Sequence, residues 1–225
     1  MSAIAPIVDA ALVPERFDPA TSDRTFRLGL SDASEIWLLP PLLRIIGRDA
    51  PGMRVIVVPV QFRTVAAAFA AGLDAAITVA DELPGSIRRA PLLQSGFVCV
   101  HDPRHARFRK LTERTYFAHE HVIVSYNADL RGVVEDTQRK QRRIRCSVPT
   151  FASLGALIEG TALLATVPGI VARELVRLRP RLAIKSLPFA PYTGTIELLW
   201  PAAGDDDEPA RWLRSRLTEI ARAAS

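Results

Sequence analysis

The order of hydrophobic and polar positions predicts alternating strands and helices in the first part of the chain. Thr25–Leu30 alternates at every second residue, which is typical of a strand. Arg54–Pro59 is a nearly continuous β-branched run, typical of a strand that is covered on both faces. Between them, apolar residues at helical spacing predict a helix that stops at residues 49–52, and Pro40 and Pro41 are tolerable only near its first turn.

The same alternation continues to the end of the chain and indicates two α/β units. The other predicted elements are strands at residues 74–79, 91–100, 122–125, 143–148, 162–167, 182–186 and 194–200, and helices at residues 65–71, 130–139, 153–159, 169–178 and 209–223. Strands that alternate with helices predict parallel sheets with helices on their faces. Each unit has about 75 to 110 residues, an ordinary domain size, so a cleft between the units is the natural ligand site.

Three polar segments follow predicted strands, at the edge where an open α/β sheet binds ligands. Residues 31–34, 61–64 and 149–153 each offer hydroxyl or amide groups beside a helix start, where free N–H groups attract anions. Phe62 and Phe151 add flat apolar surfaces, so the combination suits a small aromatic or apolar acid. The alternative is that the serines and threonines simply cap their helices.

Composition and charge narrow the class of protein. The 225 residues are 48% hydrophobic and 24% charged, which excludes disorder and fibrous repeats. Uncharged runs are too short for a membrane-spanning helix, and no basic residue precedes a hydrophobic stretch at the N-terminus, so we expect a cytoplasmic protein with no membrane contact. The excess of 29 basic over 24 acidic residues suits an anionic ligand or weak contact with DNA. Cys99 and Cys146 lie in hydrophobic runs, which predicts buried free thiols.

Catalytic and metal chemistry find little support in the sequence. All four histidines fall between His101 and His121, together with Asp102 and Glu120, so a metal site is one interpretation; surface or hinge histidines are the interpretation we favour. No nucleophile elbow, phosphate-binding loop or glycine-rich dinucleotide motif occurs. The basic run at residues 139–145 can contact phosphate, although such runs are more often a solvated helix end. We therefore expect no catalytic residue, no metal and no cofactor.

Seven short segments together resemble a known family. They are residues 17–22, 26–32, 39–43, 71–77, 130–134, 148–151 and 163–168. In order and spacing they are similar to the effector-binding domain of LysR-type transcriptional regulators, and most similar to the branch of nodulation, nitroaromatic and aromatic-catabolism regulators. The resemblance extends from residue 17 to the end of the chain.

The resemblance implies an α/β fold of two Rossmann-like subdomains joined by two crossing segments, as in type 2 periplasmic binding proteins. Subdomain 1 would comprise residues 25–100 and 190–225, subdomain 2 residues 101–189, and residues 1–24 would be the remnant of a linker to a DNA-binding domain that the chain lacks. A small-molecule inducer, expected to be an aromatic acid, would lie between the subdomains, and their movement would be transmitted to that domain. The expected assembly is a homodimer or tetramer built from helix 37–46 and a helix of the second unit, with DNA contacted only through the absent domain.

The pocket of that family maps onto ten positions of this chain. The expected effector-binding residues are Ser31, Asp32, Gln61, Arg63, Thr64, Val100, His101, Pro149, Thr150 and Phe151. Thr64 and the helix starts would hold the anionic group, and Phe151 would supply apolar contact. Two other classes remain open: a solute-binding protein of the same fold, and an enzyme of a similar two-lobed fold, such as a dehydratase with Asp32 or His101 as its acid or base.

Overall fold

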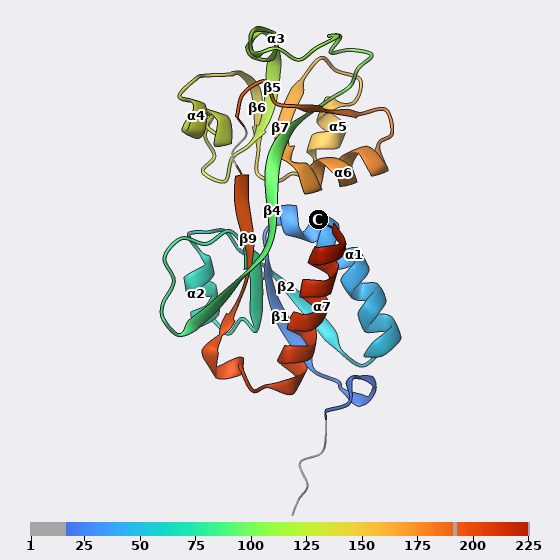
Figure 1. Cartoon of the computed structure of the whole chain (residues 1–225), viewed down its shortest axis with the longest axis vertical. Helices are drawn as coiled ribbons and strands as arrows, with labels where there is room; N and C mark the ends of the chain where they lie inside the picture. Colours follow the sequence, from blue (N-terminus) through green and yellow to red (C-terminus); the bar gives the residue numbers. More distant parts are fainter. Residues whose placement is uncertain (1–16, 191–192, 225) are drawn as a thin grey trace, which may run out of the picture.

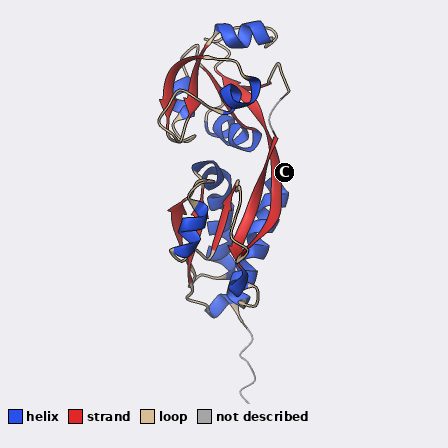
Figure 2. Cartoon of the chain, turned by 90° about the vertical axis from the view of Figure 1, so that its left-hand side faces the viewer, coloured by secondary structure: helices blue, strands red, loops and turns tan. Residues whose placement is uncertain are grey.

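Two α/β lobes lie end to end in the computed structural model, which describes residues 17–190 and 193–224. Two strands, β4 (Ile87–His101) and β9 (Thr193–Pro201), approach the junction of the lobes together (Figure 1). Figure 2 shows that they run along one side of the molecule. Residues 1–16 of the expected linker lie outside the described residues, and Pro19–Thr21 forms a single 3-10 turn.

Lobe 1 is a five-stranded sheet with helices on both faces. Its elements are β1 (Thr25–Leu30), α1 (Asp32–Asp49), β2 (Arg54–Pro59), α2 (Val65–Ala70), β3 (Ala75–Thr78), the first part of β4, β9 and α7 (Glu208–Ala224). The strand order is β2-β1-β3-β9-β4, and β1 pairs in parallel with both β2 and β3, as predicted for a strand–helix–strand–helix–strand unit. α1 and α7 pack together on one face, and α2 lies on the other (Figure 1).

Lobe 2 repeats this layering around the second half of β4. Its elements are α3 (Glu113–Ala118), β5 (Glu120–Val124), α4 (Val133–Gln138), β6 (Arg143–Val148), α5 (Leu154–Ile158), β7 (Leu164–Pro168), α6 (Gly169–Leu178) and β8 (Ala183–Ser186). β4 pairs with β9 as far as Gly96, and with β7 from Phe97 onward. Strand pairing thus places the first crossing between Gly96 and Phe97, four residues before the boundary expected at residue 100.

Three features of the fold differ from the sequence-based expectations. β2 is an edge strand with Ile56 46% exposed, so it is not covered on both faces. α1 begins at Asp32, and Pro40 and Pro41 lie in its middle; the buried Trp37, Leu38, Leu42 and Ile46 hold the helix despite the backbone hydrogen bonds that proline cannot make. The six-residue α3 was not expected, because it is too short to show helical periodicity.

Other expectations concern the thiols and the membrane. Cys99 is buried, Cys146 is half-buried, and both are free. Among the described residues, no helix is both long and apolar enough to cross a membrane.

Candidate ligand-binding site

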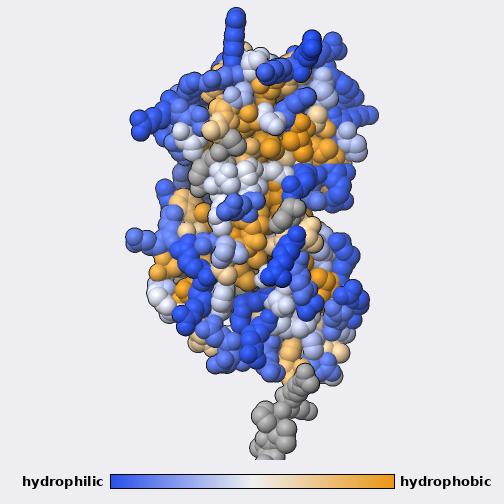
Figure 3. Space-filling model, viewed as in Figure 1, coloured by the Kyte–Doolittle hydropathy of each residue, from blue (hydrophilic) through white to orange (hydrophobic). Residues whose placement is uncertain are grey.

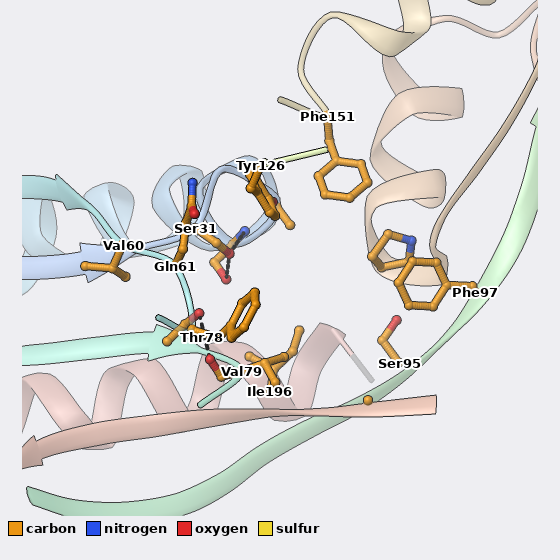
Figure 4. Close-up of a pocket in the computed structure, with 15 residues that line it drawn as sticks. Ser31, Val60, Gln61, Thr78, Val79, Ser95, Phe97, Tyr126, Phe151 and Ile196 are labelled. Carbon is orange, nitrogen blue, oxygen red and sulfur yellow. Dashed lines mark hydrogen bonds between the residues drawn. The ribbon is translucent and has the colours of Figure 1, made fainter. Parts of the chain in front are cut away.

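A cavity of about 190 Å³ lies between the two lobes and takes its walls from both (Figure 4). Its lining residues are Ser31, Ala33, Ser34, Val60, Gln61, Phe62, Thr78 and Val79 from lobe 1, Tyr126, Phe151 and Pro168 from lobe 2, and Ser95, Phe97, Gly194 and Ile196 from β4 and β9. Four of these residues carry six-membered aromatic rings. We call this space the inner cavity; its mostly apolar wall with a few polar groups is typical of a small-molecule site.

The hydroxyl groups of the inner cavity already have partners in the protein. Ser34 Oγ donates to the carbonyl of Ile77 at 3.2 Å and lies 3.1 Å from Ser31 Oγ. Thr78 Oγ1 donates to the carbonyl of Val79 at 3.2 Å. The side-chain amide of Gln61, in contrast, makes no hydrogen bond to any residue that the structure describes; Figure 4 shows this side chain among the lining residues. Gln61 therefore brings an amide donor and acceptor to the cavity wall, where it also borders a second, wider space.

Three polar contacts join the two lobes beside the inner cavity, and two of them involve the lining residues Tyr126 and Phe151. The Tyr126 hydroxyl of lobe 2 donates to Asp32 Oδ1 at the start of α1, at 2.7 Å. The backbone N–H of Phe151 donates to Asp32 Oδ2, and Arg63 donates to Asn127 at 3.4 Å. Partial burial, reinforced by the nearby Asp32 carboxylate, raises the pKa of the Tyr126 hydroxyl, so this group stays a donor. We call the three contacts the interlobe latch.

Outside the latch lies a second, wider space of about 910 Å³, the outer groove. Asp32, Thr64, Pro149 and Thr150 line this groove and not the inner cavity. Thr64 is also engaged locally, because its Oγ1 accepts the Gln61 N–H at 2.9 Å and donates to the Gln61 carbonyl at 3.2 Å. Thr64 thus holds the shape of its own loop, a role other than the anion contact expected from the sequence.

Val100 and His101 lie away from both spaces, in the interior of lobe 2. β4 continues past the crossing and places both residues between β7 and β8, where Val100 is fully buried and His101 is 2% exposed. The His101 ring stacks on Phe108 with the ring centroids 4.5 Å apart, and burial lowers the pKa of the imidazole. The prediction that Val100 and His101 face the cleft from a hinge is therefore wrong. β4 crosses between the lobes after Gly96, four residues earlier than the sequence suggested, so both residues lie inside lobe 2.

The ten expected positions therefore divide into three groups. Ser31, Gln61 and Phe151 line the inner cavity, and Gln61 lines the outer groove as well; Asp32, Thr64, Pro149 and Thr150 line the outer groove alone; Arg63, Val100 and His101 line neither of the two spaces. The exposed Arg63 places its guanidinium carbon 5.0 Å from the centroid of the Phe62 ring.

Several residues that line the inner cavity were not predicted from the sequence. Tyr126 comes two residues after β5 and could have been found by the same rule that selected Ser31 and Gln61, namely a position at the carboxyl end of a parallel strand. Ser95, Phe97 and Ile196 lie on the crossing strands, where no local pattern marks them.

Metal binding finds no support in the geometry. Within residues 17–190 and 193–224, no group of three or more histidine, cysteine, aspartate or glutamate side chains is placed to hold a metal ion. His101 and His121 are buried within lobe 2 and lie apart from the inner cavity.

Comparison with known proteins agrees with this architecture. The family model described as "LysR substrate binding domain" matches residues 20–222. The chain belongs to this family. Its members are regulatory domains that bind small molecules and not enzymes, so the dehydratase alternative falls away.

Relatives place the LysR domain among regulators of transcription. The HTH-type transcriptional activator NahR of Pseudomonas putida is 30% identical over 211 residues, covering 92% of this chain and 70% of that protein. Nodulation protein D 1 of Mesorhizobium japonicum is 27% identical over 231 residues, covering 97% and 73%. The crystal structure of the regulatory domain of MexT, a transcriptional activator in Pseudomonas aeruginosa, superposes with a TM-score of 0.79 at 33% identity, covering 87% of this chain and 99% of that one. The resemblance to LysR-type effector domains is thereby confirmed, and so is the fold of two lobes.

Proposed function

We propose that this LysR domain senses a small aromatic effector held in the inner cavity and passes the signal on by movement of its two lobes. The observation that carries the proposal is the position of the cavity: Val60 and Gln61 come from one lobe, Tyr126 and Phe151 from the other. A ligand there touches both lobes at once. It can favour one arrangement of the lobes through contacts that the other arrangement lacks, which is what allosteric signalling requires.

The acid part of the sequence-based expectation has weaker support than the aromatic part. The rings of Phe62, Phe97, Tyr126 and Phe151 surround the cavity, whereas Arg63 lines neither the cavity nor the outer groove. The proposal therefore keeps an aromatic effector, and the charge of that effector is argued separately below.

In an intact regulator, the lobe movement would change how DNA-binding domains are spaced on their operator. The effector domains would pair as a homodimer or assemble as a tetramer, with α1 and a helix of lobe 2 as the contacting helices, and DNA would be bound by a separate N-terminal domain. Such a regulator would act in the cytoplasm. The alternative within the same fold is a solute-binding protein, which would take sugars or amino acids and have no need of DNA.

A thermal-shift screen tests the proposal. The chain is melted with charged and uncharged single-ring aromatics, with sugars and amino acids as controls. A ligand at 100 times its dissociation constant adds about 2.7 kcal/mol, which raises the midpoint by about 5 to 10 °C for a chain of this size. Val79→Trp fills the cavity from a partly exposed position and should abolish the shift, while Ile56→Trp, on the edge strand, should not. A shift with sugars or amino acids alone, or one that survives Val79→Trp, would contradict the proposal.

A further inference from the structure

The charge of the inner cavity indicates which class of aromatic compound it selects. None of its fifteen lining residues is an arginine, lysine, histidine, aspartate or glutamate. Arg63 lies outside, near the Phe62 ring and Asn127. The Asp32 carboxylate, which lies in sequence between the lining residues Ser31 and Ala33, belongs to the interlobe latch and accepts a hydrogen bond from the Tyr126 hydroxyl. A carboxylate in the cavity would lose its water without gaining a cation, which is strongly unfavourable.

Two helices begin at this cavity, and one N–H group at each start has a serine hydroxyl of the chain as its partner. The N–H of Ser34 on α1 donates to Ser31 Oγ at 3.4 Å, and α1 carries Asp32 and Glu35 in its first turn. These carboxylates oppose a second negative charge at the same place. The N–H of Ile170 on α6 donates to Ser95 Oγ at 3.5 Å. One N–H at the start of α1, where the sequence predicted anion binding, and one at the start of α6, where it did not, are thus bound by serine hydroxyls of the chain itself.

The size and the polar group of the cavity complete the description. A dry apolar cavity of about 150 Å³ is enough for benzene, so the inner cavity, with a volume of about 190 Å³, fits one ring with one small substituent. The Gln61 amide offers one N–H donor pair and one carbonyl acceptor without a partner among the described residues. An amide of this kind complements a neutral hydroxyl, carbonyl or nitro group.

We propose that the inner cavity selects an uncharged single-ring aromatic compound with one hydroxyl, carbonyl, amide or nitro substituent, bound through Gln61, and that it rejects the carboxylate of the same shape. This inference rests on the proposed function and adds the chemical class of its effector. Selection follows from desolvation: the neutral compound leaves water at little cost, and the carboxylate does not.

The test compares benzamide, nitrobenzene and benzoate, which have nearly the same shape and differ in charge, by isothermal titration calorimetry on the whole chain at neutral pH. We expect benzamide and nitrobenzene to bind and benzoate to bind at least about 100-fold more weakly. Benzoate that binds wild-type protein as tightly as benzamide would overturn the inference and leave the aromatic effector of the proposed function standing. No binding by any of the three would overturn both.

Variants of Gln61 test its role separately from the overall charge. Gln61→Met keeps the length of the side chain and removes the amide, so benzamide affinity should fall about fivefold. Gln61→Arg supplies a cation and should reverse the preference in favour of benzoate. The matched controls are Gln94→Met and Gln94→Arg, because Gln94 is exposed on β4 outside the cavity. Unchanged preference in both Gln61 variants would contradict the assigned role of Gln61.

Discussion

The Tyr126 hydroxyl is the part of the interlobe latch that can be removed most cleanly. Tyr126→Phe deletes the donor to Asp32 and keeps the aromatic ring that lines the inner cavity. Hydrogen bonds to charged groups contribute about 1.5 to 3 kcal/mol. Because Tyr126 is 38% exposed, water competes for both partners, and we expect a loss of about 1 kcal/mol. The ratio of open to closed lobes should then rise about fivefold.

Distances between spin labels on the two lobes measure that ratio. Arg54→Cys on β2 and Gln141→Cys before β6 are exposed positions on opposite lobes, and Cys146→Ser removes the half-buried native thiol. Double electron–electron resonance should give a distance distribution in which the longer distances of the open arrangement are more populated in Tyr126→Phe than in wild type.

A second hydroxyl deletion provides the control for this experiment. Tyr116→Phe removes a hydroxyl that lies 2.6 Å from Thr166 Oγ1 inside lobe 2. It should lower the stability of lobe 2 and leave the distance between the lobes unchanged. Identical distributions for wild type and Tyr126→Phe would refute the reasoning, since the latch would then not hold the lobes together.

Three further predictions concern the interior of lobe 2. Burial lowers the pKa of His121 from 6.5 to about 4, so the unfolded chain binds more protons between these pH values. The free energy of unfolding should therefore fall by about 3 kcal/mol from pH 7 to pH 4; urea titrations should show a much smaller fall in His121→Gln, and equal falls would contradict it. Arg142→Met should lower the free energy of unfolding by about 3 to 5 kcal/mol, because it leaves the buried Glu135 carboxylate unpaired. The double variant Arg142→Met/Glu135→Leu should recover most of this loss in chemical denaturation. Additive losses from the two substitutions would argue against the pairing. Burial raises the pKa of Cys99 to about 12, so a thiol reagent should modify Cys146 first in native protein, and equal rates would contradict the burial.

Sequence periodicity predicted the elements best where the segment alone decides its structure. The bounds of β1, β6 and α6 agree with the predicted ranges residue for residue. β2 shows the limit of this approach. Its β-branched run indicates a strand, but whether that strand lies inside the sheet or at its edge depends on β3 pairing with the other side of β1.

Sequence reasoning found cavity-lining residues that the topology places at strand ends, and it misplaced residues whose position depends on where β4 crosses between the lobes. Ser31 and Gln61 follow parallel strands, and the carboxyl-edge rule placed them beside the cleft. His101 lies at the end of a strand too, but β4 crosses between the lobes at Gly96, and pairing with β7 then carries His101 into the interior. A difference of four residues in the crossing point of β4 thus decides whether His101 faces the cleft or the hydrophobic core of lobe 2.

The division of charge between the latch and the cavity connects closure with selectivity. The Asp32 carboxylate accepts hydrogen bonds from the Tyr126 hydroxyl and the Phe151 N–H, and these bonds join the two lobes. A ligand therefore does not need a negative charge of its own to bring the lobes together. The same residues from lobe 2 present their rings to the cavity. A ligand that fills the cavity therefore stabilises the closed arrangement through apolar contact, and closure in turn removes the water that a charged ligand would require. Because coupling between two equilibria is reciprocal, weakening the latch should lower the affinity for an uncharged ring by the same factor by which the ring strengthens the latch.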